Sequence, residues 1–200
     1  FSRNFGGTNW KEQRDAAQAY TDREPVVLIA GGGQAGISLA ATLGLIGVDA
    51  LVVDRFERAG DCWRQRYHSL ALHNDTRFNH LPYMPFPESF PTYLPKDMLA
   101  DWFEAYTWAM EINFWAGTEF VHGAYDESAG RWTAVVRRTD GTERTLHPKH
   151  LVFADGLVGS PHIPELWINQ EFPQLRGCGR RRLFSRNFLD AKRFSLFFAS

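Results

Sequence analysis

The sequence predicts an α/β fold, in which a doubly wound parallel sheet of the Rossmann type is interrupted by an antiparallel β-meander. Three observations support this fold class. A glycine-rich βαβ pattern covers residues 26–54, short alternating strands follow at about 113–147, and a buried strand returns at 150–156. Strands that alternate with helices favour a parallel sheet, whereas short strands joined by tight turns favour an antiparallel one.

The βαβ pattern is the strongest of these signals. An apolar run leads into GxGxxG at Gly31, Gly33 and Gly36, an Ala/Leu-rich helix follows, and a second apolar run ends at Asp54. In this fingerprint the glycines allow a sharp turn, a close backbone approach to a pyrophosphate and tight packing of helix on strand, while the acid binds a ribose hydroxyl. The helix start then presents N–H groups to the phosphates. We expect a dinucleotide site here; the alternative is a glycine-rich turn in another kind of α/β sheet.

The other elements follow from hydrophobic periodicity and turn residues. A polar N-terminal arm over 1–24 contains a short predicted helix at 10–19, and a long loop rich in Pro, His and aromatic residues covers 55–95. Loops of this length are uncommon and tend to be functional. An amphipathic helix is predicted at 96–112.

Alternation then indicates strands, with an Asp-Gly hairpin signal at Asp140 and Gly141. The predicted strands are 114–115, 118–125, 131–138 and 143–146. We expect the dinucleotide-binding domain to cover 25–165, with residues 166–200 forming a linker and an atypical tail.

Composition argues against several classes of protein. The formal net charge of −1 provides no basis for binding nucleic acid or a membrane surface. The cysteines, Cys62 and Cys178, are far apart, and no histidines have metal-ligand spacing, so neither a disulfide framework nor a metal site is expected. No apolar run has the length of a membrane span, and the start lacks the pattern of a signal peptide. We expect a cytoplasmic protein; its oligomeric state is not predicted.

Four segments, in order, resemble the FAD-binding part of the flavin-dependent monooxygenases. This family includes flavin-containing monooxygenases, plant auxin-forming enzymes and Baeyer–Villiger enzymes. The segments are GGGQAG at 31–36, AGDCW at 59–63, the stretch 66–106 with its LP and PFP motifs, and HLVFADG at 150–156 with a Pro-rich linker after it. The resemblance implies the fold of two-dinucleotide-binding flavoproteins.

The resemblance also implies a function. FAD would be reduced by NADPH, and one atom of molecular oxygen would pass through a flavin hydroperoxide to a small-molecule substrate. Asn74 stands where related enzymes have an Asn close to the flavin ring, so its amide is a candidate donor to the bound peroxide; the alternative is a loop-capping Asn. The candidate cofactor-binding residues are Gly31, Gly32, Gly33, Gln34, Ala35, Gly36, Asp54, Arg55, Gly60, Asp61, Trp63, His73, Val121, Ala154 and Gly156.

The sequence departs from the family pattern in ways that leave two functions open. Asp155 stands in a turn where the family has a small hydroxyl side chain, and it could repel a diphosphate if it pointed inward. No second GxGxxG for NADPH is present in the sequence. We therefore expect a partial chain, which is either a monooxygenase or an FAD-binding module without turnover of its own. An NAD-dependent dehydrogenase is disfavoured, because the segment 63–95 would have no function in one.

Overall fold

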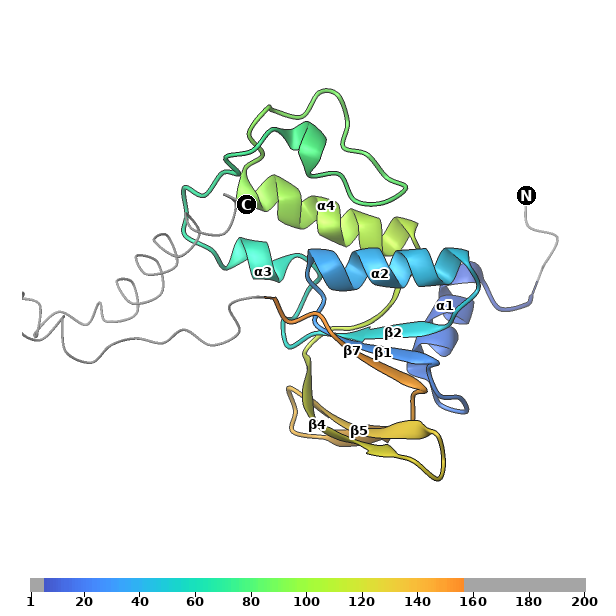
Figure 1. Ribbon diagram of the computed structural model, residues 1–200. Helices are drawn as coiled ribbons and strands as arrows, with labels where there is room; N and C mark the ends of the chain where they lie inside the picture. The colour runs from blue at the N-terminus through green and yellow to red at the C-terminus, as the bar shows by residue number, and fades with distance from the viewer. Residues whose placement is uncertain (1–5, 157–200) are drawn as a thin grey trace, which may run out of the picture.

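A parallel sheet of four strands lies at the centre of the fold (Figure 1). The computed structural model describes residues 6–156, so the predicted linker and tail at 166–200 lie outside the described residues. The strand order is β3-β2-β1-β7, with β1 at Val27–Ala30, β2 at Ala50–Val53, β3 at Asn113–Trp115 and β7 at His150–Phe153. Every residue of β1 and β2 is buried, as expected for central parallel strands covered on both faces. The predicted α/β class is confirmed.

An antiparallel meander forms a second sheet with the order β4-β5-β6. Its strands are β4 at Thr118–Asp126, β5 at Arg131–Arg138 and β6 at Glu143–Leu146. The predicted turn between β5 and β6 is present, with Gly141 at a φ of +85°. The predicted start of the meander at about 113 is corrected, because Asn113–Trp115 pairs in parallel with β2 and belongs to the central sheet.

Helices and meander cover opposite faces of the central sheet. Figure 1 shows α2 (Gln34–Leu45) and α4 (Lys96–Ala109) on one face and the meander on the other. Because side chains alternate along a strand, each central strand contributes to two cores. In β1, for example, Ile29 packs in the core with Ile37 and Phe103, and Leu28 packs in the core with Val136.

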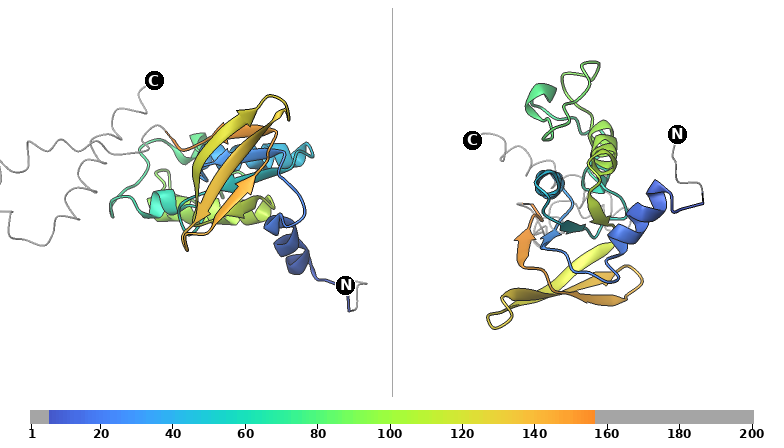
Figure 2. Two further views of the ribbon diagram at one scale, coloured as in Figure 1. Left: turned by 90° about the horizontal axis from the view of Figure 1, so that it is seen from below. Right: turned by 90° about the vertical axis from the view of Figure 1, so that its right-hand side faces the viewer.

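The N-terminal arm lies against the β3 edge of the sheet. Its helix α1 spans Trp10–Ala19, as predicted, and its N-cap residue is Asn9, whose side chain and that of Glu12 form a reciprocal capping box. The Trp115 indole N–H donates to the Gln18 carbonyl at 2.6 Å. The right-hand view of Figure 2 shows α1 beside the two sheets. The helix α1 is thus packed on the domain.

The long loop at 55–95 contains two short helical segments, α3 (Asp61–Arg64) and η1 (Thr76–Phe78). Its outer part folds onto α4, where the rings of Phe86 and Phe90 lie 5.4 and 5.5 Å from that of Trp102. No helix among the described residues is long and apolar enough to cross a membrane.

Candidate functional site

The glycine-rich loop connects β1 to α2. At two of its glycines, an added Cβ would overlap backbone atoms. Gly31 has a φ of +114°, and a Cβ there would lie 2.4 Å from the Ala154 carbonyl oxygen. A Cβ at Gly36 would lie 1.9 Å from the Gly31 carbonyl oxygen. The sharp turn and the close packing inferred for these two glycines are therefore both present.

Gly33 differs from its two neighbours in the motif. A Cβ placed on it would meet no atom within 4 Å, and its φ of −75° is one that any residue adopts. Nothing inside the described protein thus requires a glycine at this position. The open space is what a bound group that approaches the backbone would need, in agreement with the pyrophosphate function inferred for this glycine.

The start of α2 is open to an anion. Gly33 is the N-cap residue, and no side chain caps the helix. Gln34 and Ala35, the first two helical residues, are exposed. The first N–H groups of a helix have no partner within it, and they carry the positive end of the helix dipole. This helix end therefore leaves N–H donors open at the position where the sequence predicts a phosphate group.

Asp54 follows β2 and reaches the glycine-rich loop. One of its carboxylate oxygens accepts from the Gly32 N–H at 2.5 Å, and the other accepts from the Phe56 N–H at 2.9 Å. Burial raises the pKa of Asp54, although both N–H donors act in the opposite direction. Gly32 is itself covered by Phe114, because a Cβ on this glycine would lie 2.5 Å from the Phe114 ring. Phe114 is a site residue that the sequence did not indicate, since it comes from β3.

The turn after β7 packs against the glycine-rich loop. The Ala154 N–H donates to the Ala30 carbonyl at 2.7 Å, which continues the pairing of β7 with β1. This places the backbone of Ala154 and Asp155 directly against Gly31. Asp155 is exposed to solvent, and Gly156 has a φ of +80°.

The segment AGDCW at 59–63 leads into the short helix α3 and includes its first three residues; α3 packs on α4. Gly60 has a φ of +88°, and a Cβ there would lie 2.2 Å from the Ala100 carbonyl oxygen. Asp61 pairs with Arg64 at 2.8 Å and accepts from the Arg58 N–H at 3.1 Å, so its carboxylate is held by protein groups. Trp63 is half-buried against the core. Burial raises the pKa of the neighbouring Cys62 to about 12, so this thiol is a poor nucleophile.

The remaining candidates are Asn74, His73, Arg55 and Val121. The Asn74 amide donates to the Asn79 side-chain oxygen at 2.8 Å, an arrangement that fits a loop-capping residue. His73 and Arg55 are exposed. Val121 is half-buried in β4, where the pairing with β5 shifts register between Phe120 and His122. The structure thus brings Gly31, Gly32, Gly36, Asp54 and Ala154 together, while the functions inferred for these residues stay predictions.

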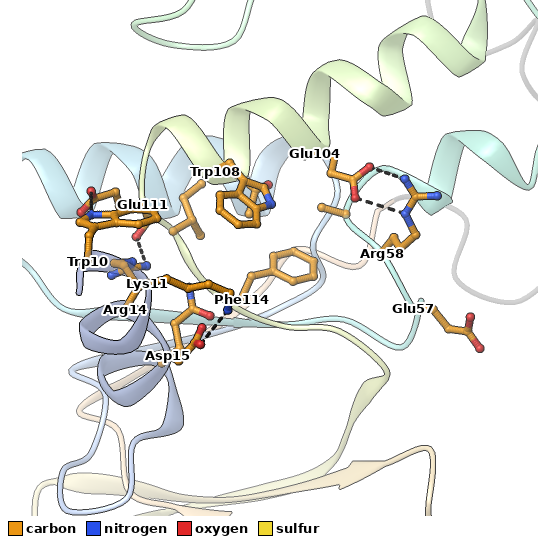
Figure 3. Close-up of a pocket in the computed structure, with 14 residues that line it drawn as sticks. Trp10, Lys11, Arg14, Asp15, Glu57, Arg58, Glu104, Trp108, Glu111 and Phe114 are labelled. Carbon is orange, nitrogen blue, oxygen red and sulfur yellow. Dashed lines mark hydrogen bonds and ion pairs between the residues drawn. The ribbon is translucent and has the colours of Figure 1, made fainter. Parts of the chain in front are cut away.

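A pocket of about 240 Å³ lies between α1 and α4. Trp10 and Trp108 line it, and Phe114 forms part of its wall (Figure 3). Through Phe114 this pocket borders the glycine-rich loop. Within residues 6–156, no group of three or more His, Cys, Asp or Glu side chains is arranged to hold a metal ion.

Comparison with known proteins identifies relatives of this chain, although no protein-family model matches it. The indole-3-pyruvate monooxygenase YUCCA1 of Oryza sativa subsp. japonica is 38% identical over 155 residues, which are 77% of this chain and 36% of that protein. The chain therefore spans much less than the full length of such a relative.

Two solved structures have the same fold. A mutant flavin monooxygenase from Stenotrophomonas maltophilia is 23% identical, with a TM-score of 0.61 over 70% of this chain and 40% of that one. A crystal structure of OTEMO in complex with FAD and NADP is 18% identical, with a TM-score of 0.61 over 72% of this chain and 28% of that one. Sequence and fold agree, and we conclude that the chain belongs to the flavin-dependent monooxygenase family.

Proposed function

We propose that this chain binds FAD as the flavin-binding part of an NADPH-dependent monooxygenase. The observation that carries the proposal is the open space at Gly33, which adjoins the uncapped start of α2. Asp54 lies at the same loop and supplies an acceptor for a ribose hydroxyl. The N–H donors and the Asp54 carboxylate at this loop therefore fit the diphosphate and the ribose of a dinucleotide.

The residues at the loop would bind the cofactor in distinct ways. The N–H groups at Gln34 and Ala35 would bind the diphosphate, and Gly33 would let it approach the backbone. Asp155 is exposed, so its negative charge is not buried against the proposed diphosphate position. Bound FAD supplies the redox chemistry and the activation of molecular oxygen, while the protein positions the flavin and excludes water.

The activity of a whole monooxygenase needs more than this chain contains. The sequence has one GxGxxG, and the chain spans 36% of the YUCCA1 relative. We infer that the chain retains FAD but oxidises NADPH slowly by itself, and that oxygen transfer to a small-molecule substrate belongs to a longer protein. A cytoplasmic location is part of this proposal and rests on the sequence alone.

The proposal is tested by the flavin content of the purified chain. The protein should be yellow, or become so on addition of FAD, and denaturation should release FAD and not FMN. Release of FMN, or failure to bind either flavin, would contradict the proposal. Fast NADPH oxidation that a substrate stimulates would contradict the inference that the chain is incomplete.

A pair of glycine variants tests the site itself. Gly33→Val should abolish FAD retention and leave the chain folded, because its side chain enters open space. Gly44→Val is the matched control, since Gly44 lies in the same helix, is exposed and would likewise have no atom within 4 Å of an added Cβ. Equal flavin content in the two variants would place the cofactor elsewhere.

A further inference from the structure

Lys96 is a buried cation in an unfavourable place. It is 6% exposed, and it is the first residue of α4, where the helix dipole repels positive charge. Lysine is seldom buried to this extent without partners, because its charged form loses hydration. The contacts of its ammonium group therefore indicate what it does.

The ammonium group of Lys96 connects α4 to α3. It donates to the Arg64 carbonyl oxygen at 3.0 Å and to the Asp97 carboxylate at 2.5 Å. The Asp97 side chain is largely exposed. Arg64 is the last residue of α3. The final carbonyls of a helix have no partner within it and carry partial negative charge. Lys96 thus caps the C-terminal end of α3.

Two further contacts come from the same face of α4. Residues 96, 100 and 104 recur at intervals of four, so they share one face of the helix. The Ala100 backbone lies against Gly60, and Glu104 accepts from the Arg64 guanidinium at 2.8 Å. A helix of four residues is too short to be stable alone, so its conformation depends on these contacts.

We propose that Lys96 is a positioning residue for the cofactor site. By holding the Arg64 carbonyl, it keeps α3 in place near Asp54, which is within electrostatic reach of Asp61 and Cys62. In that position Gly60 and Trp63 would contact FAD. This inference rests on the proposed function. It assigns Lys96 to FAD affinity and not to overall stability, since the Asp97 carboxylate that would lose its partner is largely exposed and stays hydrated.

The test compares Lys96→Met with Lys11→Met in the full chain. Lys11 also pairs with an acidic side chain, Asp15, but both of these groups are exposed. Titration with FAD, followed by flavin fluorescence, should give a Kd about tenfold higher or more for Lys96→Met, because the site is no longer pre-organised. The urea midpoint of the apo chain should not fall, and Lys11→Met should change neither quantity.

A second measurement follows α3 without FAD. Trypsin cleaves after arginine, and Arg64 and Arg66 lie in or next to α3. Native-state cleavage at these bonds should be several-fold faster in Lys96→Met than in the parent chain, because α3 opens locally. Failure of the parent chain to bind FAD would refute the proposed function, while the cleavage rates would still test whether Lys96 holds α3.

Two results would overturn the inference. One is an unchanged Kd together with unchanged cleavage. The other is a loss of FAD affinity that is matched by an equal loss of global stability, which would show a structural function only. If Lys96→Met does not fold, Lys96→Gln applies the same criteria with a neutral donor at this position.

Discussion

Two fully buried tyrosines differ in how much their hydroxyl groups are expected to contribute to the free energy of unfolding. Tyr20 and Tyr106 are both 0% exposed. The Tyr20 hydroxyl donates to the Asp49 carboxylate at 2.8 Å and accepts from the Asn113 amide at 2.8 Å. The Tyr106 hydroxyl has no hydrogen-bond partner among the described residues. Replacing Tyr20 by phenylalanine should therefore lower the free energy of unfolding, whereas replacing Tyr106 by phenylalanine should not.

The magnitudes follow from these partners. Tyr20→Phe removes a hydrogen bond to a charged group and should cost about 1.5–3 kcal/mol. Asn113 keeps its contact with the Asp49 carboxylate at 3.2 Å, so the loss is not enlarged by an orphaned amide. Tyr106→Phe removes a hydroxyl that is desolvated without compensation and should leave stability unchanged or raise it by about 1 kcal/mol. For a domain of this size, 1 kcal/mol corresponds to a Tm shift of about 2–4 °C.

Equilibrium unfolding in urea, followed by far-UV circular dichroism, measures both effects. Tyr125→Phe is the control, because Tyr125 is 45% exposed. The urea dependence of the unfolding free energy must stay constant for the comparison to hold. A loss above about 1 kcal/mol in Tyr106→Phe would refute the reasoning, since it would mean that this hydroxyl has a partner after all.

Three further predictions concern the loop and the pH dependence of stability. Gly36→Ala should destabilise the chain by about 1–3 kcal/mol in urea unfolding, because its Cβ would overlap the Gly31 carbonyl. Burial raises the pKa of Tyr106 to about 12, so the unfolded chain ionises first and stability should fall by about 1.4 kcal/mol per pH unit between pH 10 and 12. Urea unfolding at pH 9 and 11 should show a smaller fall in Tyr106→Phe. Asp54→Asn should weaken FAD binding about 10-fold or more in calorimetric titration, through loss of a charged acceptor.

Local sequence was sufficient for the elements that carry their own pattern. The strands β1 and β2 are apolar throughout, and Gly31, between β1 and α2, has a φ of +114° and no room for a Cβ. The helix α1 has its own start signal in Asn9 and Glu12. In each case the information lies within a few neighbouring residues, so the prediction required no knowledge of the rest of the fold.

The strand β3 was assigned to the wrong sheet because its pairing is not local. Three residues are too few for alternation to distinguish a meander strand from a central one. Its register places Asn113 opposite Leu51, which is 62 positions earlier in the chain. The same limit applies to the contact of Phe114 with Gly32 and to the contact of Lys96 with Arg64, each of which joins segments that are far apart in sequence.

The strand order explains why these particular residues meet. Gly31, Asp54 and Ala154 each follow the carboxyl end of a parallel strand, namely β1, β2 and β7. The chain leaves β1 toward β2 and later returns on the other side of β1, so β1 and β7 form the point at which the winding reverses. Ligands of open α/β sheets bind outside the carboxyl ends at such a point. Neighbouring strands lie about 4.8 Å apart, so β7 placed beyond β3 would be about 14 Å from β1 and Ala154 could not contact Gly31. The site therefore depends on topology as much as on the glycine motif, and a GxGxxG alone would not create it.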